Sequence, residues 1–204
     1  MKYSTQIVDN FYEDPDRIRK YALEQNFYKR GIDVPGIRSN RISDLNKQFF
    51  EFSVNKIASL YFDMDTIKLK YNVITSFQII DSKYNIGWIH QDDNGQFDVA
   101  GVIYLSPNAP INAGTSIYKP IVDSVNQVNL PMDPISIENL NVFEYEKRQK
   151  IHNSQFEKTL DIGNVYNRLV VYPVTEWHTQ SGFFGTNNED ARLTQVFFAK
   201  FTPC

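Results

Sequence analysis

The stretch GWIHQDD, residues 87–93, places an imidazole two residues ahead of a carboxylate in a chain that has only three histidines. If the stretch is extended, His90 and Asp92 leave the backbone on the same face, because alternate residues of a strand share a face. One metal ion can then take both side chains. A lone His-x-Asp also arises by chance beside solvated acids, so the pair needs a third ligand. The adjoining Asp93 either orients His90 as a hydrogen-bond acceptor or is solvated.

The remaining two histidines differ in their surroundings. His178 directly follows a strongly apolar run, where an unpaired imidazole would be costly. His152 lies in a polar stretch and is expected to be solvated. His90, Asp92 and His178 together form the two-histidine, one-carboxylate set that is typical of non-haem Fe(II) oxygenases. Zinc accepts the same three ligands with a water molecule, so the triad alone leaves the metal open.

Arg192 opens an aromatic strand in the segment ARLTQVFFAKF, and Thr194 lies two residues on. On a strand the two side chains share a face. A guanidinium fork and a hydroxyl form a donor set that holds a carboxylate. The alternative is an arginine at a strand end that reaches water or pairs with a structural acid. Its place shortly after His178 favours the carboxylate site.

The elements that position these residues are of two kinds. Asp14 and Pro15 predict the start of a helix, as N-cap and first helical residue. Ser43 or Asp44 is expected to cap a second helix across residues 45–62, which carries an apolar stripe at helical spacing. Residues 1–70 are thus predicted to form a mainly helical support region.

From about residue 71 the pattern changes to short β-like runs, separated by Gly, Pro, Asn and Asp. The runs do not alternate with helices, which favours an antiparallel sandwich or jelly roll over a parallel sheet. We expect residues 71–204 to form this core within one domain of 204 residues. The runs are 71–80, 98–105, 167–174 and 191–201.

A long polar insertion at about 119–165 interrupts the core, with a helix expected around Glu138–Gln149. Its polar composition argues against core packing, and both of its ends are expected near the mouth of the jelly roll. Long loops in compact domains are commonly functional. The insertion is therefore predicted to form a lid or substrate-binding flap, and an excursion without a role is the alternative.

The composition excludes some classes of partner. The net charge is -3 and no basic stripe occurs, which makes a nucleic-acid partner unlikely. No apolar run approaches membrane-spanning length, and no N-terminal targeting segment is recognised. The single cysteine, Cys204, is consistent with a reducing cytoplasm. The expectation is a cytoplasmic protein with a small-molecule or peptide substrate and an open oligomeric state.

From about Ser76 to Phe201 the sequence resembles the Fe(II)- and 2-oxoglutarate-dependent dioxygenases, in particular the prolyl-hydroxylase-like group. The order and spacing of the motifs carry the resemblance. Two features depart from the pattern: Ala113 stands where glycine is usual, and the insertion is long for the group. The similar segments are FQIIDSKYNIGWIHQDD, VAGVIYLSPNAPINAGTSIYKP, NRLVVYPVTEWHTQSG and RLTQVFF.

The resemblance implies a double-stranded β-helix, or jelly roll, with His90, Asp92 and His178 as Fe(II) ligands. Arg192 would bind the distal carboxylate of 2-oxoglutarate, helped by the hydroxyls of Thr194 and Tyr104. The implied reaction uses dioxygen, hydroxylates an amino-acid, peptide or small-molecule substrate, and releases succinate and CO2. Two alternatives stay open: a non-enzymatic jelly-roll module that binds metal or a partner, and a zinc hydrolase or cupin-like enzyme.

Overall fold

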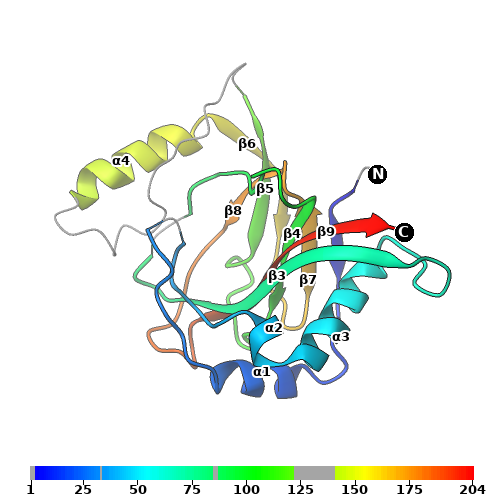
Figure 1. Cartoon of the computed structure of the whole chain (residues 1–204). Coiled ribbons are helices and arrows are strands. Elements are labelled where there is room, and N and C mark those ends of the chain that lie inside the picture. Colours follow the sequence, from blue (N-terminus) through cyan, green and yellow to red (C-terminus); the bar gives the residue numbers. More distant parts are fainter. Residues whose placement is uncertain (1–2, 33, 85–86, 122–140) are drawn as a thin grey trace.

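The computed structural model describes residues 3–32, 34–84, 87–121 and 141–204. In these residues the strands form two antiparallel sheets (Figure 1). The major sheet has the order β1 (Gln6–Val8), β7 (Leu169–Pro173), β4 (Val99–Tyr104), β9 (Arg192–Pro203), β3 (Leu69–Ile80), β2 (Ile37–Arg38). The minor sheet has the order β6 (Phe156–Ile162), β5 (Thr115–Pro120), β8 (Trp177–Gln180). The predicted jelly-roll architecture is confirmed.

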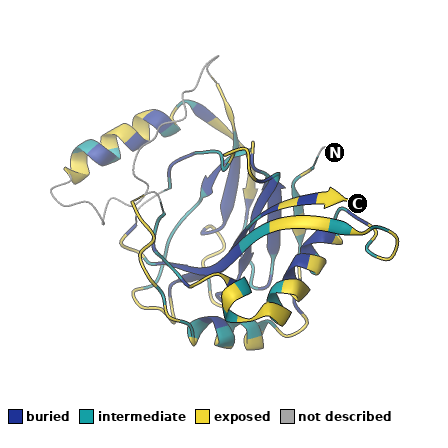
Figure 2. Cartoon of the chain, viewed as in Figure 1, coloured by how far each residue is buried: buried dark blue, intermediate teal, exposed yellow. Residues whose placement is uncertain are grey.

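Three helices cover the outer face of the major sheet: α1 (Pro15–Leu23), α2 (Ile42–Leu45) and α3 (Lys47–Ala58). Val54 and Ile57 of α3 join Phe77, Leu193 and Phe197 of the sheet in one apolar core. Both faces of the central strands are covered, so β3, β4, β7 and β9 are largely buried while the helices expose their outer sides (Figure 2).

A second apolar core lies between the two sheets. Val102, Tyr104 and Val196 of the major sheet contribute to it together with Ile117 and Ile162 of the minor sheet. Alternate residues of β9 therefore pack into two different apolar cores. Leu193 and Phe197 face the helices, whereas Arg192, Thr194, Val196 and Phe198 lie on the inner face, toward the minor sheet.

The N-terminal helices begin partly where the sequence predicts. Asp14 caps α1, and its side chain accepts a hydrogen bond from Arg17 N at 3.0 Å. The expected cap of the second helix, Ser43 or Asp44, is wrong. Residues 42–58 form two helices, because Asn46 adopts an extended conformation and its side chain accepts a hydrogen bond from Phe49 N at 2.9 Å.

The first seventy residues also contribute strands to the major sheet. β1 pairs with β7, and β2 pairs with β3. Neither strand was predicted, because three and two residues are too short to display an alternating pattern. β2 matters most for the site, since it places Arg38 at the edge of the sheet, beside β3.

The polar insertion is structured where it is described. β6 pairs with β5 in the minor sheet, and α4 (Val142–Asn153) packs through buried Tyr145, Gln149 and His152. The expectation that composition keeps this segment out of the core fails only at single positions of residues 142–162, namely the three buried residues of α4 and the two ends of β6. Only the two end residues of β6 are buried, so the segment carries no period-two signal. The expected helix begins at Val142 and reaches Asn153, whereas residues 122–140, which belong to the proposed lid, lie outside the described residues.

In the described parts of the chain, no helix is long and apolar enough to cross a bilayer.

Candidate active site

Backbone pairing brings His90, Asp92 and His178 to one place. His90 and His178 form an isolated antiparallel bridge, with His90 N donating to His178 O at 3.0 Å and His178 N donating to His90 O at 2.9 Å. Asp92 N donates to Val174 O at 3.0 Å, in the turn between β7 and β8. The segment around residue 90 thus extends the minor sheet beyond β8, and it carries two of the three polar side chains.

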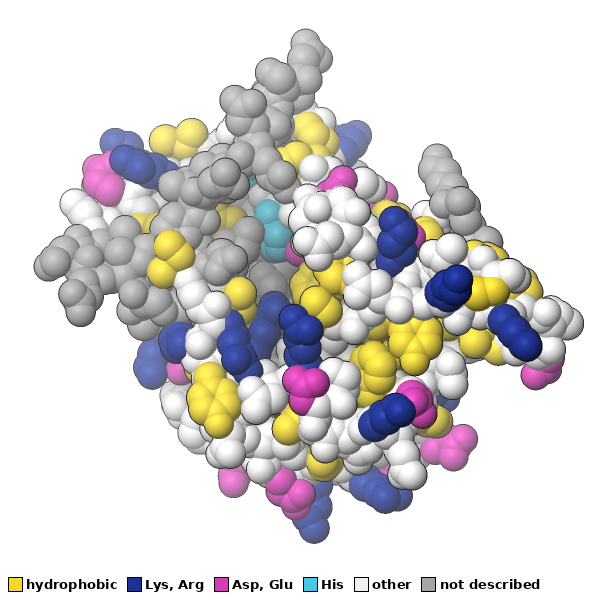
Figure 3. All heavy atoms as spheres, in the orientation of Figure 1, with side chains coloured by type: hydrophobic (Ala, Val, Ile, Leu, Met, Phe, Trp, Pro, Cys, Tyr) yellow, Lys and Arg dark blue, Asp and Glu magenta, His cyan; other side chains and the backbone are white. Residues whose placement is uncertain are grey.

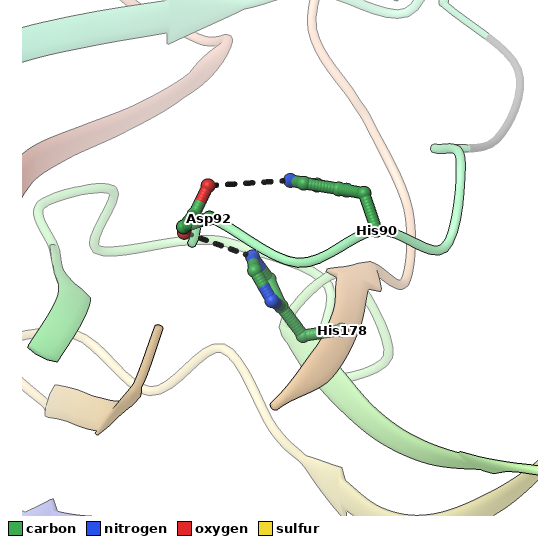
Figure 4. Close-up of side chains that lie close together, drawn as sticks. All are labelled: His90, Asp92 and His178. Carbon is green, nitrogen blue, oxygen red and sulfur yellow. Dashed lines mark ion pairs between the residues drawn. The ribbon is translucent and has the colours of Figure 1, made fainter. Parts of the chain in front are cut away.

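The three side chains converge on a common point (Figure 4). Asp92 Oδ1 lies 3.6 Å from His90 Nε2, and Asp92 Oδ2 lies 3.3 Å from His178 Nε2. All three candidate ligand atoms lie within 4.8 Å of one another. Ligands at metal distances of about 2.1 Å are about 3 Å apart when they occupy adjacent octahedral positions. The predicted convergence is therefore confirmed, and the spacing suits a single ion.

Hydrogen bonds to the backbone select the tautomer of both imidazoles. His90 Nδ1 lies 2.7 Å from Trp88 O, and His178 Nδ1 lies 2.9 Å from Glu176 O. A carbonyl oxygen only accepts, so each Nδ1 must carry the proton. Each Nε2 then keeps its lone pair, which points toward the Asp92 carboxylate. This arrangement is the one that a histidine metal ligand needs.

The charges at the centre are strongly coupled. Burial alone would raise the pKa of Asp92, but His178 and His90 outweigh it and hold this pKa far below its usual range. Burial opposes the charged form of His90, but the neighbouring Asp92 carboxylate and the Trp88 carbonyl raise the pKa of His90 above its usual value. Asp92 is therefore ionised at neutral pH, and below the raised pKa of His90 a proton competes with a metal for Nε2.

Asp93 does not take part in the centre. Its side chain is exposed, and Oδ1 accepts a hydrogen bond from Gly95 N at 3.0 Å in the following turn. Of the two alternatives for Asp93, the solvated one is confirmed, because the carbonyl of Trp88 accepts the hydrogen bond of His90 Nδ1.

Helix α4 holds the segment that carries His90. Asn153 Oδ1 accepts from Ile89 N at 3.0 Å, and Asn153 Nδ2 donates to Gly87 O at 3.0 Å. His152 Nε2 donates to Ile89 O at 2.7 Å, and the ring is only 4 % exposed. The expected solvation of His152 is therefore wrong.

We expect Asn153→Ala to weaken metal binding about tenfold, since residues that orient metal ligands typically contribute 10–100-fold in affinity. Without its side chain, Ile89 N and Gly87 O lose their partners and His90 gains freedom. Anaerobic Fe(II) titration measures the change. Asn141→Ala is the matched control, because it removes the N-cap hydrogen bond of the same helix at its far end. An equal loss in both variants would mean that only helix stability matters.

Among the described residues, Arg192 is the largest fully buried side chain. Its guanidinium donates to Ala113 O at 3.2 Å and to Gly114 O at 3.4 Å, and it lies 5.4 Å from the centre of the Tyr104 ring. Burial lowers the pKa of Arg192, and Tyr104 and Tyr172 oppose this shift. Gly114 is required here, because a Cβ would collide with the carbonyl oxygen of Ile162.

Thr194 lies beside Arg192 on the inner face and opposite Tyr104 in the register of the sheet. The Tyr104 hydroxyl donates to Thr115 Oγ1 at 2.8 Å. Thr194 Oγ1 is buried and has no hydrogen-bond partner among the described residues. A buried hydroxyl without a partner is costly. An orphaned hydroxyl next to a buried guanidinium fits the carboxylate of a bound 2-oxo acid.

Tyr172 lies between the three candidate metal ligands and Arg192. Its ring centre lies 4.4 Å from that of His178. Burial raises the pKa of Tyr172 well above its usual value, Asp92 adds to the shift, and the guanidinium of Arg192 opposes it. The Arg192 guanidinium contacts the residues just before β5, and β5 pairs with β8, which carries His178, so Arg192 and the triad both lie against the minor sheet. Sequence reasoning missed Tyr172, although it lies on the apolar strand that leads to His178.

Comparisons with known proteins agree with this architecture. The model of a family described as "Family of unknown function (DUF6445)" matches residues 2–198. No curated protein matches the sequence.

Several solved structures share the fold. HygX from Streptomyces hygroscopicus, with nickel, 2-oxoglutarate and hygromycin B bound, superposes with a TM-score of 0.58 at 12% identity, covering 96% of this chain and 82% of that one. A 2OG-Fe(II) oxygenase family oxidoreductase from Burkholderia pseudomallei gives 0.52 at 11% identity, covering 97% and 84%. A prolyl hydroxylase from Trichoplax adhaerens, in complex with a hypoxia inducible factor peptide, gives 0.51 at 11% identity, covering 96% and 83%.

Proposed function

We propose that this chain, which belongs to the family DUF6445 and has the fold of the 2OG-Fe(II) oxygenases, is itself an Fe(II)- and 2-oxoglutarate-dependent oxygenase. The balanced reaction is R–H + 2-oxoglutarate + O2 → R–OH + succinate + CO2. The observation that carries the proposal is the buried Arg192, which lies two residues from the unpartnered hydroxyl of Thr194 and contacts the start of β5, the strand that pairs with His178.

His90, Asp92 and His178 would hold the iron through two imidazole nitrogens and one carboxylate oxygen. Three ligands on one side leave the other positions of an octahedral ion for the co-substrate and dioxygen. When bound, Fe(II) supplies the oxidising chemistry that couples decarboxylation of 2-oxoglutarate to oxidation of the substrate. The chain contributes fixed Nδ1–H tautomers and an ionised carboxylate, so the donors are ready before the metal arrives.

Arg192 would bind the distal carboxylate of 2-oxoglutarate with its planar fork. Thr194 would donate its free hydroxyl to the same carboxylate, and Tyr104, whose hydroxyl donates to Thr115 Oγ1, lies opposite Thr194 in the register of the sheet. The neighbouring Val102, Val196 and other members of the inter-sheet core exclude water from this end of the site. A desolvated carboxylate is held more strongly by a guanidinium than a solvated one.

The alternatives receive less support. If the metal only stabilised the fold, nothing would explain why the Arg192 guanidinium is buried near the unpartnered hydroxyl of Thr194. A zinc hydrolase needs a general base near the metal, and the nearest carboxylate along the chain, Asp93, turns outward to Gly95. The substrate of this chain is proposed only as a small molecule, an amino acid or a peptide.

The test is anaerobic reconstitution with Fe(II) and 2-oxoglutarate. We expect a weak visible charge-transfer band from the chelate, and, once air and candidate substrates are admitted, succinate and CO2 in equal amounts. Succinate in place of 2-oxoglutarate, and omission of Fe(II), are the matched controls and should give no band. A protein that binds Fe(II) but gives neither the band nor 2-oxoglutarate consumption would contradict an oxygenase and favour the metal-binding module.

A further inference from the structure

A second arginine belongs to the inner face of the major sheet. Arg38 of β2 pairs with Gln78 of β3, Gln78 pairs with Thr194 of β9, and Thr194 pairs with Tyr104 of β4. Residues that face each other across neighbouring strands point to the same side of a sheet. Arg38 therefore leaves the backbone on the side where Thr194 and Tyr104 lie, at the edge of the sheet.

The guanidinium of Arg38 extends along this face toward the metal end. It lies 6.0 Å from the centre of the Phe198 ring, and its charge acts on the Tyr172 hydroxyl. Phe198 and Tyr172 are both paired with Ala100, so they lie on one row of the sheet, four residues along β9 from Thr194. Tyr172 in turn contacts the ring of His178.

The two guanidiniums differ in their exposure to solvent, although both act on the Tyr172 hydroxyl. Arg192 is closed off from solvent, as the distal pocket of a co-substrate requires. Arg38 is half-buried on the edge strand. Figure 3 shows Lys and Arg side chains along one side of the hollow in which a histidine is visible.

We propose that Arg38 determines substrate specificity by binding a carboxylate of the primary substrate, a carboxylate-bearing small molecule or peptide. Its planar fork can take both oxygens of that group, and the aromatic rings of Phe198 and Tyr172 flank the path from there to the metal. The proposal rests on the oxygenase function proposed above. It deepens that function, because it separates a substrate carboxylate at Arg38 from the co-substrate carboxylate at Arg192.

The test uses the Fe(II)-loaded protein with saturating 2-oxoglutarate and the twenty common L-amino acids, each beside its uncharged carboxamide. We expect at least one acid to stimulate succinate release at least tenfold more than its amide. Arg38→Gln removes the charge and should bring this acid-to-amide ratio close to one. Arg38→Lys keeps the charge but loses the fork, and should restore part of the ratio.

Arg41→Gln is the matched control, since Arg41 is an exposed arginine three residues along the same segment, and it should keep the ratio. Thermal shifts of the Zn(II)- and 2-oxoglutarate-loaded protein with the same pairs report acid preference without turnover. This binding measurement does not depend on the proposed reaction. If the proposed reaction itself is wrong, the wild-type protein will form no succinate with any of these compounds. An unchanged ratio in Arg38→Gln, a tenfold rise in its KM for 2-oxoglutarate instead, or a panel without any acid preference would each overturn the proposal.

Discussion

Asp92→Ala is expected to abolish Fe(II)-dependent succinate formation, with a loss of at least about a thousandfold, or about 4 kcal/mol. The Asp92 carboxylate is the group that approaches both imidazoles, with one oxygen toward His90 Nε2 and the other toward His178 Nε2. Its removal leaves two neutral nitrogens and no anionic ligand. His90→Ala should have a similar effect, because it leaves two ligands on one side of the ion.

Asp93→Ala is the matched control for this prediction. Asp93 is the next residue and carries the same charge, but it is exposed and bonded to Gly95 N. We expect it to keep activity within about twofold of the wild type, as is usual for surface substitutions. Circular dichroism and thermal melting should show that both variants fold. Equal activity losses in Asp92→Ala and Asp93→Ala would point to the charge of the segment and not to metal ligation.

The second large effect concerns the co-substrate. Arg192→Ala is expected to raise the KM for 2-oxoglutarate at least tenfold, about 1.4 kcal/mol or more. Truncating one partner of a buried charge pair typically costs about 2–5 kcal/mol, so the KM for 2-oxoglutarate can rise by more than tenfold. Arg192→Lys should be intermediate, because it keeps a charge but cannot offer a planar fork. Initial rates of succinate release at varied 2-oxoglutarate measure the change.

Arg17→Ala, an exposed arginine on α1, is the control for loss of a positive charge. Thermal shift separates binding from folding: 2-oxoglutarate should raise the melting temperature of wild-type protein more than that of Arg192→Ala. An unchanged KM in Arg192→Ala would mean that another cation holds the distal carboxylate. Arg38, on the same face of the sheet, would then be the first candidate.

Much of the site follows from local sequence because its geometry is local. His90 and Asp92 share a face by strand periodicity alone, and His178 was the remaining histidine in an apolar setting. The strands 71–80, 98–105, 167–174 and 191–201 were recognisable because covered central strands are rich in β-branched and aromatic residues. Their observed bounds differ from the predicted ones by at most two residues.

The residues that were missed reach the site through long-range register. Arg38 is in place only because β2 pairs with β3, and Tyr172 only because β7 pairs with β4. No local pattern specifies such pairing. The prediction for His152 failed for another reason. Its neighbours in the sequence are polar, and its burial depends on partners far away in the chain, namely the Ile89 carbonyl oxygen and the Trp88 ring.

The contacts of α4 also determine where the minor sheet stops. His90 uses its backbone groups to pair with His178, so the N–H and C=O of Ile89 point outward on the other side of the segment. An uncovered strand edge of this kind is a template for pairing with a second copy of a chain. The side chains of Asn153 and His152 form hydrogen bonds with these two backbone groups, so helix α4 covers this edge of the minor sheet. The interactions that hold a candidate metal ligand thus also protect the protein from edge-to-edge self-association.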